Sequence, residues 1–157
     1  MGLEELFGRI EKRFGKEAVV GNDIKVDTVS SGSMALDEIL GGGFALGRIH
    51  EIYGGFSSGK SSAALHLSAS VQKTLGKAVG YVDTEQALDL EYAKALGVDL
   101  SRDKWIMSQP DSAEQALEIV REMLEVPEIG LVVLDSVAGL VPEAVLQGEA
   151  GDAKIAL

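Results

Sequence analysis

Short strand-like segments and longer helix-like stretches alternate along the chain. Uninterrupted apolar runs at 78–82 and 131–134 are typical of strands buried on both faces of a parallel sheet. Shorter strand-like segments occur at 26–29, 48–53 and 105–107. Helix-like stretches occur at 3–14, 33–40, 60–75, 89–96 and 112–124. This alternation predicts βαβ units, and therefore an α/β fold with a mainly parallel sheet flanked by helices.

The first helix-like stretch, residues 3–14, is strongly amphipathic. Its apolar side chains follow a helical spacing, and Gly15 suits the position just after a helix. The stripe consists of Leu3, Leu6, Phe7, Ile10 and Phe14. No neighbouring segment in the sequence covers this stripe. The pattern alone supports packing on its own domain and docking on a neighbouring subunit equally.

Residues 54–61 match G-x-x-x-x-G-K-[ST], the phosphate-binding P-loop. Gly54 and Gly59 permit positive φ and leave no Cβ between a phosphate and the backbone N–H groups. Lys60 would reach the β- and γ-phosphates, and the Ser61 hydroxyl would hold Mg²⁺. The alternative is a glycine- and serine-rich turn with a solvated lysine. The complete motif, between the strand-like segment 48–53 and the helix 60–75, favours nucleotide binding.

Two carboxylates follow predicted strands. Asp135 comes after the apolar run 131–134, where a carboxylate can hold Mg²⁺, usually through water. Glu85 follows the run 78–82, at the carboxyl edge of the sheet where ligands bind in open α/β folds. From there Glu85 could activate a water for attack on the γ-phosphate, although a solvated loop glutamate is the alternative. Tyr92 could stack on a base or face the inside of its own helix, and the pattern favours neither.

Composition narrows the class of protein. The chain has 157 residues and 46% hydrophobic residues, which indicates one globular domain. No apolar run is long enough to span a membrane, and the absence of cysteine is compatible with a cytoplasmic protein. The formal net charge of −11, with no block of basic residues, argues against electrostatic binding of nucleic acid by this chain.

Five stretches together resemble the bacterial and phage-type RecA recombinase family. The resemblance runs from about residue 10 to residue 157, and several stretches in combination are far more specific than a P-loop alone. The stretches are 53–62, 81–89, 108–118, 133–138 and 148–152. The resemblance implies a P-loop NTPase of the RecA-like fold. Residues 1–30 would form an N-terminal helix and linker that serve as an oligomerisation arm, and residues 31–157 a partial ATPase core.

The resemblance also implies the function and the site. The protein would be an ATP-dependent recombinase that binds single-stranded DNA, forms helical filaments, and serves homologous recombination, DNA repair and the SOS response. Glu85 would activate the attacking water with Lys60 beside it, Ser61 and Asp135 would hold Mg²⁺, and Asp89 and Tyr92 would contact the adenine. Residues 3–14 would dock on the next protomer. The phosphates would be held by Gly54, Gly55, Phe56, Ser57, Ser58, Gly59, Lys60, Ser61 and Ser62.

The sequence departs from the family pattern at three places. Gly55 and Phe56 replace the usual Pro-Glu, Gln86 stands where His is common, and Ser61 replaces Thr but keeps the hydroxyl. The chain ends within the stretch that resembles the first DNA-binding loop, so the core is expected to be incomplete and the charge argument against DNA binding is weakened.

Two other functions remain open. One is a non-catalytic module that binds nucleotide or docks on other protomers. The other is a different RecA-superfamily ATPase, such as a ring helicase or a clock-type ATPase, against which the stretches 109–111 and 148–152 argue.

Overall fold

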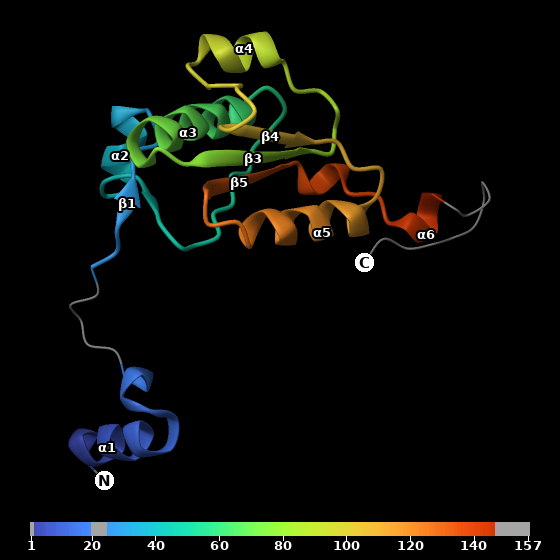
Figure 1. Cartoon of the computed structure of the whole chain (residues 1–157). Coiled ribbons are helices and arrows are strands. Elements are labelled where there is room, and N and C mark those ends of the chain that lie inside the picture. The colour runs from blue at the N-terminus through green and yellow to red at the C-terminus, as the bar shows by residue number, and fades with distance from the viewer. Residues whose placement is uncertain (1, 20–24, 147–157) are drawn as a thin grey trace.

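A three-stranded parallel sheet forms the centre of the molecule. A computed structural model describes residues 2–19 and 25–146 of the chain. The strands are β3 (Ala78–Asp83), β4 (Trp105–Ser108) and β5 (Ile129–Asp135), in the spatial order β4-β3-β5. Helix α3 (Lys60–Leu75) lies on one face of the sheet and α5 (Ala113–Leu124) on the other (Figure 1). The predicted α/β fold with a parallel sheet between helices is confirmed.

Strand β3 is buried along its whole length because it lies between two strands and two helices. Successive side chains of a strand point to opposite faces. Val79 and Tyr81 accordingly join the core under α3, with Leu65 and Val71 among its members. Val82 joins the core on the other face, under α5. An uninterrupted apolar run is therefore what this central position requires.

The helices begin and end close to the predicted residues. Ser112 caps α5 by accepting a hydrogen bond from the Gln115 backbone N–H, and Gly76 ends α3 with φ +66°. Asp89 caps α4 (Leu90–Ala95). Ser33 caps α2 (Met34–Ile39). Each cap satisfies a backbone group that the helix leaves unpaired, which is why these polar residues and glycines mark the boundaries.

A small antiparallel pair lies apart from the main sheet. Strand β1 (Thr28–Val29) was predicted, whereas its partner β2 (Phe44–Ala45) was not. Gly43 makes the close pairing possible, because a Cβ at this position would lie 2.2 Å from the Val29 carbonyl oxygen. The short segments η1 (Lys16–Ala18), η2 (Val137–Gly139) and α6 (Glu143–Leu146) were also not predicted.

The prediction of a strand at residues 48–53 is wrong. Residues 49–54 form no regular secondary structure, and the side chains of Ile49 and Tyr53 are exposed. A strand is stabilised by its hydrogen-bonded neighbour, and within the described ranges no strand pairs with this segment. The chain thus reaches the P-loop as an irregular segment.

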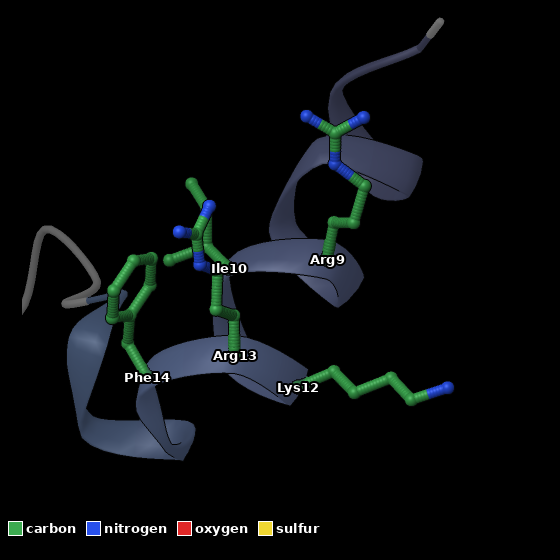
Figure 2. Close-up of a pocket in the computed structure, with 5 residues that line it drawn as sticks. All are labelled: Arg9, Ile10, Lys12, Arg13 and Phe14. Atoms are coloured by element: carbon green, nitrogen blue, oxygen red, sulfur yellow. The ribbon is translucent and has the colours of Figure 1, made fainter.

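Helix α1 (Leu3–Phe14) forms as predicted and stands apart from the sheet (Figure 1). None of its residues is buried; Leu3 and Phe14 are largely exposed, and Phe7 is partly exposed. Figure 2 shows the Ile10 and Phe14 side chains on one side of the helix and Lys12 projecting away from them. The Arg13 guanidinium lies 5.1 Å from the centroid of the Phe14 ring. Within the described structure, no residue of the apolar stripe is buried by another segment.

No helix in the described part of the chain combines the length and the apolar character needed to span a membrane.

Candidate functional site

The P-loop forms the turn between the irregular segment 49–54 and helix α3. Gly59 has φ +89°, as predicted, and Ser57 also adopts positive φ, at +57°. Gly54 does not use the positive φ that a glycine permits. A Cβ at Gly54 would lie 2.8 Å from the Ser58 Oγ, so the Ser58 side chain would have to rotate to accommodate it. Residues 55–59 are exposed, so the backbone of the loop is accessible to a ligand.

Lys60 bends back over the loop. Its Nζ donates hydrogen bonds to the carbonyl oxygens of Gly54, at 3.2 Å, and Gly55, at 3.0 Å. The ammonium group therefore lies on the loop that opens helix α3. The free N–H groups and the dipole of this 16-residue helix favour an anion at the same end. Lysine, loop and helix terminus together provide positive potential at one point.

Ser61 and Asp135 meet across 74 residues of sequence. The Ser61 Oγ donates a hydrogen bond of 2.7 Å to the Asp135 Oδ2. Ser61 is the second residue of α3, and Asp135 is the last residue of β5. A hydroxyl beside a carboxylate supplies the hard oxygen ligands that Mg²⁺ prefers.

Tyr81 lies under this pair. Its hydroxyl donates a second hydrogen bond of 2.7 Å to the same Asp135 Oδ2, while its side chain is fully buried. Burial, and then the hydrogen bond to Asp135, raise the pKa of the Tyr81 hydroxyl well above its ordinary value. Tyr81 therefore remains a neutral donor. Its sequence context, in the apolar run 78–82 and at the start of the family-like stretch 81–89, did not indicate this role.

Glu85 lies at the same edge of the sheet, tied to the residue that follows β5. The Ser136 Oγ donates a 2.5 Å hydrogen bond to the Glu85 Oε1. Thr84 fixes this connection through one oxygen atom. Its Oγ1 donates to the Ser136 carbonyl oxygen at 2.7 Å and accepts from the Ser136 N–H at 2.9 Å. The two carboxyl-terminal strand ends are thus joined by side chains as well as by the sheet.

Asp83 organises the loop that carries Glu85. This buried carboxylate accepts hydrogen bonds from the backbone N–H groups of Ala87, at 3.3 Å, and Leu88, at 3.1 Å. The Gln109 Nε2 also donates to the Asp83 Oδ2, at 3.1 Å. Residue 109 belongs to one of the stretches on which the family resemblance rests. Its part in holding the loop was not predicted.

Asp89 and Tyr92 belong to the start of α4, where Tyr92 contacts the first turn of α3. Asp89 caps α4 by accepting a hydrogen bond from the Tyr92 N–H, at 3.0 Å. The Tyr92 hydroxyl donates to the Ser62 Oγ, at 3.1 Å. Tyr92 is partly exposed, and its hydroxyl is turned toward α3. Phe56, at the tip of the loop, is fully exposed and packs against nothing within the described structure.

The predicted residues thus converge from three segments. The P-loop, Glu85 and Asp135 meet where α3 begins and where β3 and β5 end. The residues fit a nucleotide with Mg²⁺, because an exposed loop with three glycines, a lysine, a hydroxyl and a carboxylate stand together. The predicted DNA-loop residues 148–152 lie outside the described residues.

Besides Asp83 and Gln109, three further residues at this site were not predicted: Tyr81, Thr84 and Ser136. Thr84 directly precedes the predicted Glu85, and Ser136 directly follows the predicted Asp135. Tyr81 carries a weaker signal, a single hydroxyl within an apolar run. A buried hydroxyl needs a hydrogen-bond partner, and that rule points to a nearby acceptor without identifying it.

Comparison with known proteins identifies the family of this chain. The model of the RecA N-terminal domain matches residues 2–157. The chain is 50% identical to Protein RecA of Latilactobacillus sakei over 99% of its own length and 44% of that protein's length. It is 48% identical to Protein RecA of Arthrospira platensis, covering 99% of this chain and 43% of that protein.

The chain therefore spans less than half the length of the curated relatives it matches. The family match covers the P-loop, both carboxylates and α1 in one continuous alignment. The chain belongs to the RecA family, with its sequence matching the N-terminal domain.

Proposed function

We propose that the protein binds ATP with Mg²⁺ at residues 54–62 and hydrolyses it as part of a cytoplasmic DNA recombinase. The observation that carries this proposal is the 2.7 Å hydrogen bond between Ser61 and Asp135, which joins the P-loop to the carboxylate at the end of β5. A glycine- and serine-rich turn with a solvated lysine would have no reason to meet such a carboxylate. The RecA relatives support the same assignment.

Each residue has a separate role in the proposed reaction. The P-loop N–H groups and Lys60 hold the phosphates, and Lys60 exchanges its bonds to the Gly54 and Gly55 carbonyls for bonds to phosphate oxygens. Ser61 and Asp135 hold Mg²⁺, which neutralises charge on the phosphates when it is bound. Glu85 accepts a proton from the attacking water. Its present partner, the Ser136 hydroxyl, keeps its carboxylate at the edge of the sheet.

The adenine would lie beside α4. Asp89 and Tyr92 stand at the start of this helix, and the bond from Tyr92 to Ser62 brings the ring next to the P-loop helix. The partly exposed face of Tyr92 offers a surface for stacking. Asp89 offers a carboxylate oxygen to the exocyclic amine of the base.

The assignment of the chain to a filament-forming recombinase rests on the RecA relatives and on helix α1. We assign residues 1–30 to an arm for self-association and residues 31–157 to the ATPase core. The exposed apolar stripe of α1 supports docking on another protomer, as a step in filament formation. Single-stranded DNA is the proposed nucleic-acid partner, and residues 148–152 are the contact proposed within this chain.

The test is nucleotide binding and turnover by the protein, with and without single-stranded DNA. Lys60→Ala is expected to weaken ATP binding at least tenfold, because it removes a charge-assisted contact to phosphate. Lys73→Ala, on the exposed last turn of the same helix, is the matched control and should leave binding unchanged. Unchanged ATP binding by Lys60→Ala would contradict the P-loop assignment.

Glu85→Gln separates catalysis from binding in the same experiment. It is expected to retain ATP binding and to lower the rate of hydrolysis at least a hundredfold, since an amide cannot accept the proton. Equal turnover by Glu85→Gln and the unmodified protein would show that Glu85 is not the base. ATP binding with no turnover by any form would favour the non-catalytic module.

A further inference from the structure

The Tyr81 hydroxyl is placed unusually for a core residue. The side chain has no exposed surface, and its ring packs beside Trp105 with 5.3 Å between the ring centroids. The hydroxyl nevertheless reaches the end of the neighbouring strand and donates to the Asp135 Oδ2. The apolar body of the residue serves the core under α3, and its polar end lies at the candidate active site.

Two hydroxyls converge on the Asp135 Oδ2. Tyr81 donates from beneath the sheet edge and Ser61 from the start of α3, each at 2.7 Å. A carboxylate oxygen can accept both bonds. Because the Ser61 hydrogen points at Asp135, the lone pairs of the Ser61 Oγ are directed elsewhere and remain available to a cation. The direction of the Ser61 hydroxyl therefore depends on where the Asp135 carboxylate is held.

Packing alone does not explain a hydroxyl here. Phenylalanine would fill the same volume on β3, and a buried hydroxyl without a partner would destabilise the fold. Asp135 is the one side-chain acceptor that the described structure gives to the Tyr81 hydroxyl. The hydroxyl therefore acts on Asp135.

We propose that Tyr81 is a positioning residue for Mg²⁺, which fixes the Asp135 carboxylate and through it the Ser61 hydroxyl. This inference rests on the proposed ATP site. Tyr81 itself does not touch the cation or the nucleotide. Its contribution is to keep the ligand pair in one arrangement before the cation arrives, so that binding does not have to order the two side chains.

The test measures how much Mg²⁺ is needed to bind a fluorescent ATP analogue. Tyr81→Phe is expected to raise the Mg²⁺ concentration at half-saturation about tenfold, and to leave binding in excess EDTA within about twofold. A variant whose fold is damaged would bind the analogue more weakly both with Mg²⁺ and in excess EDTA. Tyr53→Phe, which removes an exposed hydroxyl, is the matched control and should change neither value.

A double-mutant cycle tests whether Tyr81 affects the Mg²⁺ requirement through Asp135. In an Asp135→Asn background, Tyr81→Phe is expected to change the Mg²⁺ requirement by less than about twofold, because its partner has already been altered. A folded Tyr81→Phe variant with the Mg²⁺ requirement of the unmodified protein would overturn the proposal while leaving the ATP site intact. Failure of the unmodified protein to bind the analogue under any condition would instead contradict the proposed function.

A second measurement keeps Tyr81 unchanged in case the phenylalanine variant does not fold. The protein is labelled with fluorotyrosine, and the Tyr81 resonance is assigned by removing Tyr53 and Tyr92 in turn. Addition of Mg²⁺ to the nucleotide-bound protein is expected to shift the Tyr81 resonance and to leave that of Tyr53 in place. An unmoved Tyr81 resonance at saturating Mg²⁺ would overturn the proposal.

Discussion

Thr84 and Ser136 hold the carboxyl ends of β3 and β5 together through one side-chain oxygen. The Thr84 Oγ1 is both donor and acceptor toward the backbone of Ser136, and the Thr84 N–H also donates to the Asp135 carbonyl at 2.9 Å. Glu85 and Asp135 are the direct sequence neighbours of this pair. The distance between the proposed base and the proposed cation site is therefore fixed by residues that take no part in the chemistry.

Thr84→Val tests this connection. Valine keeps the shape of threonine and removes both side-chain hydrogen bonds, so the half-buried Ser136 N–H and carbonyl lose a partner. The free energy of unfolding is expected to fall by about 1–2 kcal/mol, measured by urea denaturation. Thr84→Ser keeps the hydroxyl and is expected to lose less than half as much. Equal losses for valine and serine would show that the methyl group matters, and not the hydrogen bonds.

For single residues, the sequence reveals local motifs but not the hydrogen-bond partners that lie far away along the chain. Gly59, Lys60 and Ser61 could be assigned because their roles follow from spacing within eight residues. Tyr81 and Thr84 could not be assigned, since their partners lie 54 and 52 residues away and are set by the register between β3 and β5. That register depends on the packing of both strands against α3 and α5, which no local pattern records.

Among the elements, the packing of α5 on β3 depends on Gly80. A Cβ added to Gly80 would lie 2.5 Å from the Met123 Sδ and 3.4 Å from its Cγ. The glycine thus leaves room for a buried methionine of α5. The run 78–82 was predicted to be buried on both faces, but the role of its glycine depends on the helix that covers it.

Gly80→Ala is expected to lower the free energy of unfolding by about 1–3 kcal/mol, because Met123 must leave its present rotamer or α5 must shift. Thermal or urea unfolding measures the loss. In a Met123→Ala background the same glycine substitution is expected to cost little, since the space is then open. Equal costs in both backgrounds would mean that Gly80 serves another purpose.

Helices and strands could be predicted best where residues of the element itself determine its ends. Helix α3 begins at Lys60 and ends before Gly76, as predicted. Gly59 and Gly76 mark its two ends through local backbone geometry. The segment 48–53 has strand-like composition but no strand, because pairing requires a neighbour that composition does not specify. Strand β2 was missed for the converse reason, since its two residues are defined by their pairing with β1.

For the molecule as a whole, α1 is a 12-residue amphipathic helix with no buried residue. The stripe that contains Phe7 and Phe14 remains exposed, and the core that contains the sheet is built without it. Self-association through this helix would bury the stripe against a second copy of the chain.

Phe7→Ala is expected to weaken self-association at least tenfold in dissociation constant, because burial of a phenylalanine side chain contributes about 1.5–3 kcal/mol. Sedimentation velocity over a range of protein concentrations measures the change. Lys12→Ala, on the side of the helix away from Ile10 and Phe14 (Figure 2), is the control and should not weaken association. Equal association by Phe7→Ala and the unmodified protein would exclude the stripe as the contact.

The bond between Ser61 and Asp135, with 74 residues between its ends, also bears on how the protein folds. Parallel strands and such distant contacts form slowly, because long loops must close before any contact stabilises them. The candidate site therefore cannot exist until β3 and β5 have paired. A ligand that binds only this completed arrangement stabilises the sheet as a unit, by about 2.7 kcal/mol at a concentration one hundred times its dissociation constant. ATP, the ligand proposed for this site, would then also stabilise the folded protein.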